Sequence, residues 1–570
     1  MSSMSPDRKS PQAGRLLYWL GLPVFWFVVA LVVRLLYMLE QAGTSPLFYI
    51  PLLDEKEAVE SAREILTGAV SAEPYFKAPA YSWLMAGVMV LTGNAWPWAI
   101  RILQHLAGAG LAAVVARLAG MLSPPARRRL SVGIAGGLAA FYAPLVRLEE
   151  NLSLDIWVTV LQTFMLYALA AWARGRANRW VMLAGLLAAA AWLTRPTLTL
   201  ILPVIAVWML WCLRGRKGVL AAGIFLLPVA LAMVGVILRN EVVSGQPLTM
   251  PWQGGFSFYE ANRPGANGRY YLQSDYVETS HANPARQLSL DGYTASLTDE
   301  ERKDFDRAPD YGAVSSWWFQ RTMDTVRDEP AAWLVLMGRK LVYLFSDKEI
   351  FNYEDYDLQR SLSALLPWLP GRFGIVFPVA LASLAVAGTL SPGRRRIAVL
   401  LWLYVVFLSG AIALYFVSGR MRMPLAPPLM ALAGCTAALI PALTRRRQAV
   451  ALVLMAVGAM VSWGDWWGVR SETMAHVDLA RMSNAAWYRG RYEQALEFAL
   501  ESEKLNPDNP ALPRLKAQAL YNLGRLQEAE VEFARSVQVL GDETSRKNLE
   551  VVRKEIARRG PSAPLSPPSP

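Results

Sequence analysis

Long apolar runs separated by short clusters of basic residues constrain this chain more than any other feature. They lie near 16–39, 98–121, 131–148, 154–173, 180–194, 197–213, 219–238, 372–390, 397–417, 423–443 and 449–464. A helix rises about 1.5 Å per residue, so most of these runs are close to the length needed to cross a membrane. The chain has 570 residues, 54% of them hydrophobic, and a mean hydropathy of +0.25. We therefore predict an all-α polytopic membrane protein with about 11 transmembrane helices.

The basic clusters predict which side of the membrane each segment faces. Those at 127–129, 174–179, 214–217, 394–396 and 445–447 fall on one side together with the N-terminus. The positive-inside rule makes that side cytoplasmic, including residues 1–15, and an odd number of spans places the C-terminus outside. A bacterial inner or plasma membrane fits this pattern. Because these clusters account for the net charge of +12, no nucleic-acid partner is expected.

Two outer segments of the membrane domain at 16–465 are too long to be simple connectors. The first covers about 40–97, with an amphipathic helix predicted over 54–70 and a short apolar helix over 80–92 that lies at the membrane surface or re-enters it. The second covers about 239–371. Its stretch 252–268 is rich in Gly, Asn and aromatic residues, which predicts a turn-rich binding loop that contains Tyr259.

The tail at 470–558 lacks apolar runs and shows a period of 34 residues. Gly490-Arg491 is repeated at Gly524-Arg525, and Ala495 at Ala529. The spacing resembles tetratricopeptide repeats, which stack paired helices and present a groove to a partner protein. Only two units are recognisable, so 473–482 is a candidate capping helix. The Pro-rich end at 559–570 is predicted to be disordered.

The first outer segment holds an acidic pair and a lysine about 22 residues apart along the chain. Asp54 is a candidate general base, with Glu55 beside it; alternatively, Asp54 caps the helix that it begins and pairs with Glu57 in a capping box. Lys77 can hold a phosphate, or it can extend to lipid headgroups. Tyr81 follows in the same motif and is a candidate substrate contact.

Further charged residues map to the outer side, where the positive-inside rule disfavours cations. The arginines there are Arg101, Arg195, Arg420 and Arg422. The acidic residues are Glu149, Glu150 and Asp155. The arginines can bind a lipid-linked phosphate or pair with these acids. The acids can orient an acceptor, bind a divalent cation with Asp54, or neutralise the arginines. Two cysteines and three histidines exclude a disulfide framework and a histidine metal site, so no cofactor is assigned and a divalent cation is left open.

In their order and placement, these motifs resemble the C superfamily of glycosyltransferases, which includes the protein O-mannosyltransferases and the aminoarabinose transferase of lipid A. The resemblance rests on Asp54-Glu55, on Tyr75-Phe-Lys77-Ala-Pro79-Ala-Tyr81, on Arg101, on Leu193-Thr-Arg195-Pro196 and on Gly419-Arg420-Met-Arg422-Met-Pro424. Ala78 stands where the family has a proline, and the acidic site of the third span is displaced.

The resemblance implies an inverting transfer of a hexose or pentose from a polyprenyl-phosphate donor to a protein or glycolipid hydroxyl outside the membrane. Asp54 would accept the hydroxyl proton, with Glu55 as its neighbour. Lys77 and the outer arginines would stabilise the leaving phosphate. Separately, the groove expected of the repeats gives the hypothesis that the tail recruits the acceptor or a partner protein. The main alternative is a transporter or lipid flippase, which would place its charges near the middle of the membrane. A second is a non-catalytic anchor for the repeats.

Overall fold

The computed structural model describes residues 18–69, 72–175, 177–269, 284–352, 354–471, 473–541 and 543–559. Every named element in these ranges is a helix, as predicted for an all-α protein. The cytoplasmic assignment of 1–15 and the disorder assigned to the end of the chain concern residues outside these ranges, apart from Arg559, which ends the last helix.

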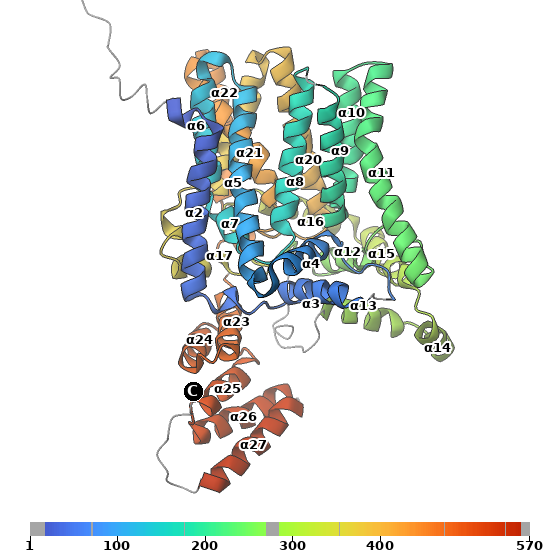
Figure 1. Cartoon of the computed structure of the whole chain (residues 1–570), viewed down its shortest axis with the longest axis vertical. Helices are drawn as coiled ribbons and strands as arrows, with labels where there is room; N and C mark the ends of the chain where they lie inside the picture. The colour runs from blue at the N-terminus through green and yellow to red at the C-terminus, as the bar shows by residue number, and fades with distance from the viewer. Residues whose placement is uncertain are drawn as a thin grey trace, which may run out of the picture.

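The largest part of the molecule is a bundle of upright helices (Figure 1). Its members are α2 (Pro23–Thr44), α5 (Trp96–Leu122), α6 (Arg128–Ala140), α8 (Asp155–Ala173), α9 (Arg179–Thr194), α10 (Leu202–Cys212), α11 (Arg216–Ser244), α20 (Pro392–Ala413), α21 (Ala426–Leu439) and α22 (Arg445–Trp463), with α18 (Phe373–Leu381) packed on α21 and α22. Six helical stretches in the described residues are long and apolar enough to cross a membrane: Pro23–Thr44, Ala80–Leu122, Asp155–Ala173, Arg216–Ser244, Pro392–Ala413 and Arg420–Ala442. The protein is therefore an integral membrane protein, and the count of about 11 spans stays a prediction.

The outer surface of the bundle is apolar. On α11, Leu220, Leu227, Leu231 and Leu238 all point outward and are more than half exposed. A water-soluble protein rarely exposes a continuous apolar stripe of this length, because burying it would be strongly favourable. The stripe is what a helix in contact with lipid chains requires.

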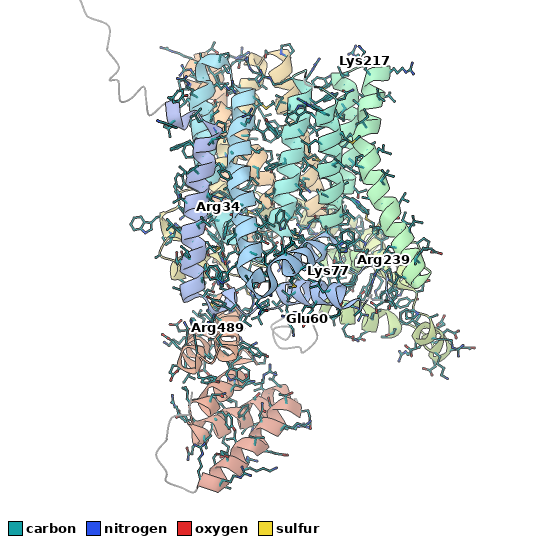
Figure 2. All side chains as sticks on the ribbon, viewed as in Figure 1. Arg34, Glu60, Lys77, Lys217, Arg239 and Arg489 are labelled. Atoms are coloured by element: carbon teal, nitrogen blue, oxygen red, sulfur yellow. The ribbon has the colours of Figure 1, made fainter. Side chains whose placement is uncertain are left out.

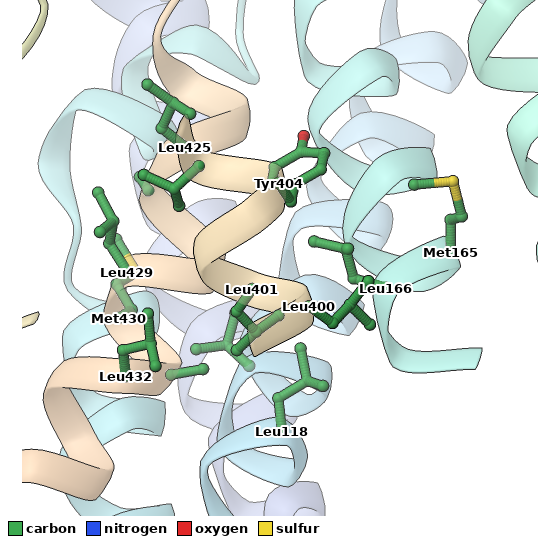
Figure 3. Close-up of a cluster of buried hydrophobic side chains, with 14 of the residues drawn as sticks. Leu118, Met165, Leu166, Leu400, Leu401, Tyr404, Leu425, Leu429, Met430 and Leu432 are labelled. Atoms are coloured by element: carbon green, nitrogen blue, oxygen red, sulfur yellow. The ribbon is translucent and has the colours of Figure 1, made fainter. Parts of the chain in front are cut away.

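The interior of the bundle is closely packed (Figure 3). Leu118 of α5, Leu166 of α8, Leu401 of α20 and Leu429 of α21 are fully buried and lie in one apolar cluster. Small residues bring the helices together elsewhere: a Cβ added at Gly136 of α6 would lie 2.3 Å from the ring of Trp26 on α2. Close approach at small residues is typical of membrane helices.

Two predicted segments differ from the structure. The run at 131–148 is divided into α6 and the short helix α7 (Ala143–Leu148), because Pro144 begins a new helix and Tyr142 bridges to Gly371. The predicted loop at 252–268 is wrong over its first part, which forms α12 (Gln253–Asn262). Glycine serves there in close packing: a Cβ at Gly255 would clash with the backbone of Ser315.

The shorter helices gather at the end of the bundle opposite Lys217, where Lys77 lies (Figure 2). The predicted helices of the first outer segment form as α3 (Asp54–Thr67) and α4 (Ala80–Thr92). The second outer segment supplies α12, α13 (Pro284–Thr294), α14 (Asp299–Arg307), α15 (Tyr311–Asp328), α16 (Pro330–Leu344) and α17 (Tyr356–Leu362). The tail lies beyond this same end (Figure 1).

The tail consists of α23 (Ala475–Tyr488), α24 (Tyr492–Leu505), α25 (Leu512–Asn522), α26 (Leu526–Leu540) and α27 (Glu543–Arg559), each packed against the next. The 34-residue period matches equivalent positions in this stack. Gly490 and Gly524 both adopt the left-handed conformation, with φ of 71° and 75°, between consecutive helices. Ala495 and Ala529 are both fully buried. The assignment to tetratricopeptide repeats remains a prediction.

Candidate active site

A cavity of about 1260 Å³ opens at the end of the bundle where α3 and α4 lie. One wall is apolar and includes Leu408, Ile412 and Phe416, which follow one another along and just beyond α20. The charged residues of its lining are Asp54, Glu57, Glu64, Glu73, Lys77, Arg195, Arg239, Glu260, Arg286 and Arg420. A cavity that combines an apolar wall with charges of both signs suits an amphipathic ligand.

Asp54 lies at the centre of an ion-pair cluster in this cavity. Its Oδ1 accepts a hydrogen bond from Nζ of Lys77 at 2.9 Å, and its Oδ2 lies 3.3 Å from Nη1 of Arg420. Nζ of Lys77 also donates to Oε2 of Glu57. The capping alternative for Asp54 is wrong, because Asp54 is the first helical residue, Leu53 occupies the cap position and no side chain caps the helix. The Asp54 carboxylate faces the cavity instead.

The backbone before Asp54 is strained. Leu53 adopts φ 52° and ψ −126°, a conformation that costs about 1–3 kcal/mol in a residue with a side chain. It is one of two non-glycine residues with positive φ among those described. Such strain persists only where the surrounding structure enforces it, and here it fixes the direction in which Asp54 leaves the chain.

Arg420 joins Asp54 to a second acid. Its Nη1 lies 3.3 Å from Oδ2 of Asp155, and Arg195 pairs with the other carboxylate oxygen of Asp155. Asp155 is buried at the start of α8, and Arg195 follows the end of α9. The cluster thus contains three carboxylates, from Asp54, Glu57 and Asp155, and three cations.

The ammonium group of Lys77 is held in its charged form. Burial lowers its pKa, but the carboxylates of Asp54 and Glu57 outweigh burial and hold the pKa above its ordinary value. Lys77 therefore remains a cation throughout the physiological pH range.

Glu55 does not share the cavity with Asp54. Its Oε1 accepts a hydrogen bond from the backbone nitrogen of Leu152 at 2.9 Å. Burial raises the pKa of Glu55, and the nearby guanidinium of Arg101 partly offsets this rise. Glu55 lines instead a second, small pocket of about 90 Å³. This second pocket shares Leu53, Asp54, Ser153 and Arg420 with the large cavity, so Asp54 and Arg420 stand between the two spaces.

Four predicted site residues lie in buried ion pairs outside both spaces. Arg101 pairs with Glu150 at 2.8 Å, and Arg422 pairs with Glu349 at 2.7 Å. Glu149 pairs with Arg34 at 2.7 Å, and His105 lies between Glu149 and Glu150. None of Arg101, Glu149, Glu150 and Arg422 lines the large cavity or the second pocket. The alternative of pairing with a nearby acid thus holds for Arg101 through Glu150, and also for Arg195 and Arg420 through Asp155.

The two predicted tyrosines differ in position. Tyr81 lines the large cavity, and its hydroxyl donates to Oε1 of Gln104 at 3.0 Å. Tyr259 on α12 packs its ring 4.7 Å from that of Trp318 and is not part of the lining. Its neighbour Glu260 takes the place in the cavity wall that was expected of Tyr259.

Several charged residues of the cavity were not predicted from the sequence. Glu57 was considered only as part of a helix cap. Arg239, near the end of α11, lies 4.1 Å from the ring of Tyr75, and Arg286 on α13 pairs with Glu73. In the sequence, Arg239 and Arg286 stand out only because they lie away from the basic clusters. The buried Arg101 shares this feature, so it does not identify residues of the cavity.

The described residues contain no group of three or more His, Cys, Asp or Glu side chains placed to hold a metal ion. No residue in the described part of the chain is therefore assigned as a ligand of a divalent cation, whose requirement the sequence did not decide.

The fold and the site define a helical membrane protein with a charged, amphipathic cavity at one end of its bundle. Residues 76–238 match the model of the dolichyl-phosphate-mannose-protein mannosyltransferase family. This match, which includes Lys77, Arg101 and Arg195, confirms that the chain resembles membrane glycosyltransferases of the C superfamily. A comparison with curated proteins gave no match.

Two solved structures are similar at low scores. ArnT from Cupriavidus metallidurans, bound to undecaprenyl phosphate, is 16% identical, with 94% of this chain and 79% of that chain covered and a TM-score of 0.39. The archaeal oligosaccharyltransferase AglB from Archaeoglobus fulgidus, in complex with an inhibitory peptide and a dolichol-phosphate, is 12% identical, with 83% and 59% covered and a TM-score of 0.38. At these scores the likeness supports no conclusion about this chain.

Proposed function

We propose that the protein is an inverting glycosyltransferase that moves a sugar from a polyprenyl-phosphate donor to an acceptor hydroxyl. The observation that carries the proposal is the position of Asp54, which contacts Lys77 and Arg420 in the wall of the large cavity. A carboxylate beside preorganised cations suits a reaction that removes a proton from one partner and releases a phosphate from the other. The family match over residues 76–238 supports the same reaction class.

The donor occupies the large cavity in this proposal. Its prenyl chain lies along the apolar wall formed by Leu408, Ile412 and Phe416, and its phosphate lies against Lys77, Arg195 and Arg420. Guanidinium groups bind phosphate oxygens through paired hydrogen bonds, and lysine acts as a point charge. Tyr81 in the same lining is a candidate contact to the sugar.

The reaction is a single displacement. The acceptor oxygen attacks the anomeric carbon of the sugar from the face opposite the phosphate. The new carbon–oxygen bond forms as the bond from the anomeric carbon to the phosphate oxygen breaks, which inverts the configuration. The acceptor proton passes to the Asp54 carboxylate, and the electron pair of the broken bond leaves on the polyprenyl phosphate. Lys77 and Arg420 stabilise the charge that develops there.

The residues in buried ion pairs take another role in this proposal. Arg101, Glu149, Glu150 and Arg422 hold the helices around the site and do not contact the donor. Glu55 faces the second pocket, and Tyr259 supports the packing of α12 on α15. The reaction takes place on the side opposite the basic clusters, which makes the N-terminus cytoplasmic and the repeats extracytoplasmic.

The test is an assay of the purified full-length protein with a panel of polyprenyl-phosphate-linked hexoses and pentoses and with peptide and glycolipid acceptors. We expect sugar transfer from at least one donor, with an inverted anomeric configuration in the product by NMR. Retention of configuration would contradict the proposed single displacement. If no donor were consumed, the transporter alternative would replace the enzyme.

Replacing Lys77 with methionine is expected to weaken donor binding. The change removes a charge-assisted contact to the phosphate and retains most of the apolar side chain, so the donor KM should rise roughly tenfold. Because the Lys77 pKa lies above its ordinary value, the effect should be the same at pH 7 and pH 9. Lys56→Met on the same helix as Asp54, at a half-exposed lysine outside the cavity lining, is the control. Equal donor KM values in K77M and wild type would contradict the role of Lys77.

A further inference from the structure

Arg269, Arg339, Tyr343 and Trp467 form an arginine–aromatic patch that lies apart from the candidate active site. Cζ of Arg339 on α16 lies over the ring of Trp467, 5.2 Å from its centroid, and Cζ of Arg269 lies 5.5 Å from the centroid of the Tyr343 ring. The rings of Tyr343 and Trp467 meet edge to face, with their centroids 5.8 Å apart. None of the four residues lines the large cavity or the second pocket. The proposed reaction therefore does not account for the patch.

The two arginines of the patch are close enough for their charges to repel. Burial lowers the pKa of Arg269 and the charge of Arg339 lowers it further, whereas the nearby Tyr343 raises it. The Nε atom of Arg339 is buried and has no hydrogen-bond partner among the described residues. Asp465, whose charge reaches Tyr343, accepts a hydrogen bond from the backbone nitrogen of Arg470. An anion shared by the two guanidinium groups would relieve their repulsion.

The backbone at Trp467 is strained. Its φ of 52° and ψ of 35° lie in the left-handed region, which bulky residues rarely adopt. It is the second of the two non-glycine residues with positive φ among those described. Arg470 closes the turn, because its Nη1 donates to the carbonyl of Trp463 at 3.0 Å. Such strain persists where the surrounding structure enforces it, and here it sets the Trp467 ring against Arg339.

The patch borders the lipid-facing surface of the bundle. The helix α22 begins at the basic cluster 445–447 and ends at Trp463, so the patch lies at the end opposite this cluster. At that end α22 meets α16, since the hydroxyl of Ser462 donates to the carbonyl of Phe345 at 2.7 Å. Both helices expose apolar side chains: Val453, Val457 and Met460 on α22, and Leu334, Val335 and Leu341 on α16. Trp463 is 56% exposed, as is typical of tryptophans at the boundary between lipid chains and headgroups.

An anionic phospholipid has the chemistry that this patch can recognise. Guanidinium groups bind the oxygens of a phosphodiester through paired, charge-assisted hydrogen bonds. The acyl chains of the same lipid can lie along the exposed apolar side chains of α16 and α22. A zwitterionic lipid carries an ammonium group that the two arginines repel, so a headgroup with net negative charge is favoured. Free phosphate would satisfy the arginines but would leave the apolar side chains uncovered.

We propose that the arginine–aromatic patch binds an anionic phospholipid such as phosphatidylglycerol, in the leaflet on the side opposite the basic clusters. The phosphodiester lies between Arg269 and Arg339, and the headgroup lies against Trp467. The bound lipid also steadies one edge of the large cavity. The backbone nitrogen of Val417 donates to the carbonyl of Gly268, beside Arg269, and Val417 directly follows Phe416 of the apolar wall.

The test measures lipid binding to the purified, delipidated full-length protein with no sugar substrate present. Native mass spectrometry gives the affinities for phosphatidylglycerol and for phosphatidylcholine of the same acyl chains at one ionic strength. We expect wild type to prefer phosphatidylglycerol roughly tenfold, and Arg339→Gln to abolish the preference. Arg339→Lys keeps the charge without the planar donors and should retain part of it. Arg327→Gln, at an exposed arginine of α15 that pairs with Asp324, is the matched control.

Four outcomes would overturn the inference. They are equal affinities for the two lipids in wild type, an unchanged preference in R339Q, loss of the preference in Lys77→Met instead of R339Q, and binding of inorganic phosphate in place of the lipid. The third would move the lipid to the large cavity. Trp467→Ala is a second, independent variant and should lower the affinity for phosphatidylglycerol alone. Thermal unfolding without lipid checks the folding of each variant. Because no sugar is transferred in this test, its failure leaves the proposed function intact, and the reverse also holds.

Discussion

Replacing Asp54 with asparagine is expected to lower turnover by about 10²- to 10⁴-fold, the range for loss of a general base. Asparagine keeps the shape of the side chain and its contact with Lys77 through an oxygen, but it cannot accept the acceptor proton. The helix should be unaffected, because Asp54 does not cap it and the strained residue is Leu53. Turnover is measured as sugar transfer under saturating donor and acceptor, with thermal unfolding of the detergent-solubilised protein as the check on folding.

The matched control for this variant is Glu57→Gln. Glu57 also pairs with the Lys77 ammonium, but unlike Asp54 it lines only the large cavity and does not stand between the two spaces. We expect E57Q to reduce turnover far less than D54N. Equal losses in the two variants would show that both acids act only by holding Lys77, and wild-type turnover in D54N would remove Asp54 from the chemistry.

Replacing Arg420 with glutamine is expected to affect turnover, whereas the same substitution at Arg422 is expected to affect stability. Arg420→Gln should lower turnover about 10²- to 10³-fold, because it removes a donor aimed at the developing phosphate charge. It should leave stability largely unchanged, since Asp155 retains its pairing with Arg195. Arg422→Gln should destabilise the protein by about 3–5 kcal/mol, because it leaves the carboxylate of Glu349 buried without its partner.

The two arginine variants are compared by thermal unfolding and by turnover per folded molecule. In R420Q the folded protein should be nearly inactive, whereas in R422Q the activity should fall only as far as the folded fraction falls. Loss of turnover per folded molecule in R422Q would place that arginine in the reaction, although it lies outside both spaces. A stable, fully active R420Q protein would contradict the proposed leaving-group role.

The sequence predicted local features of this protein well. The apolar runs and the amphipathic pattern after Asp54 gave the bundle and the helices α3 and α4, because both depend on residues near one another in the chain. The period of 34 residues predicted the equivalent turns at Gly490 and Gly524 for the same reason.

The arrangement of the site depends on contacts between distant residues. Arg101 and Arg195 are alike in sequence, since both are arginines at the outer ends of spans. Arg195 lines the cavity and Arg101 does not, because each is positioned by its own acidic partner. Asp54 and Arg420 are 366 residues apart. No local pattern distinguishes such residues, so their positions in the site emerge only from the fold.

In the proposed reaction, the cluster of three carboxylates and three cations to which Asp54 belongs has a further consequence for the timing of catalysis. While Asp54 is ionised, part of the positive charge of Lys77 and Arg420 is neutralised, which limits how tightly the resting enzyme holds a phosphate. When Asp54 takes up the acceptor proton, that neutralisation ends at the moment the phosphate departs. In this proposal, proton transfer to Asp54 thus strengthens the electrostatic field of the two cations. Loss of the proton afterwards weakens the field again and allows the spent lipid carrier to leave.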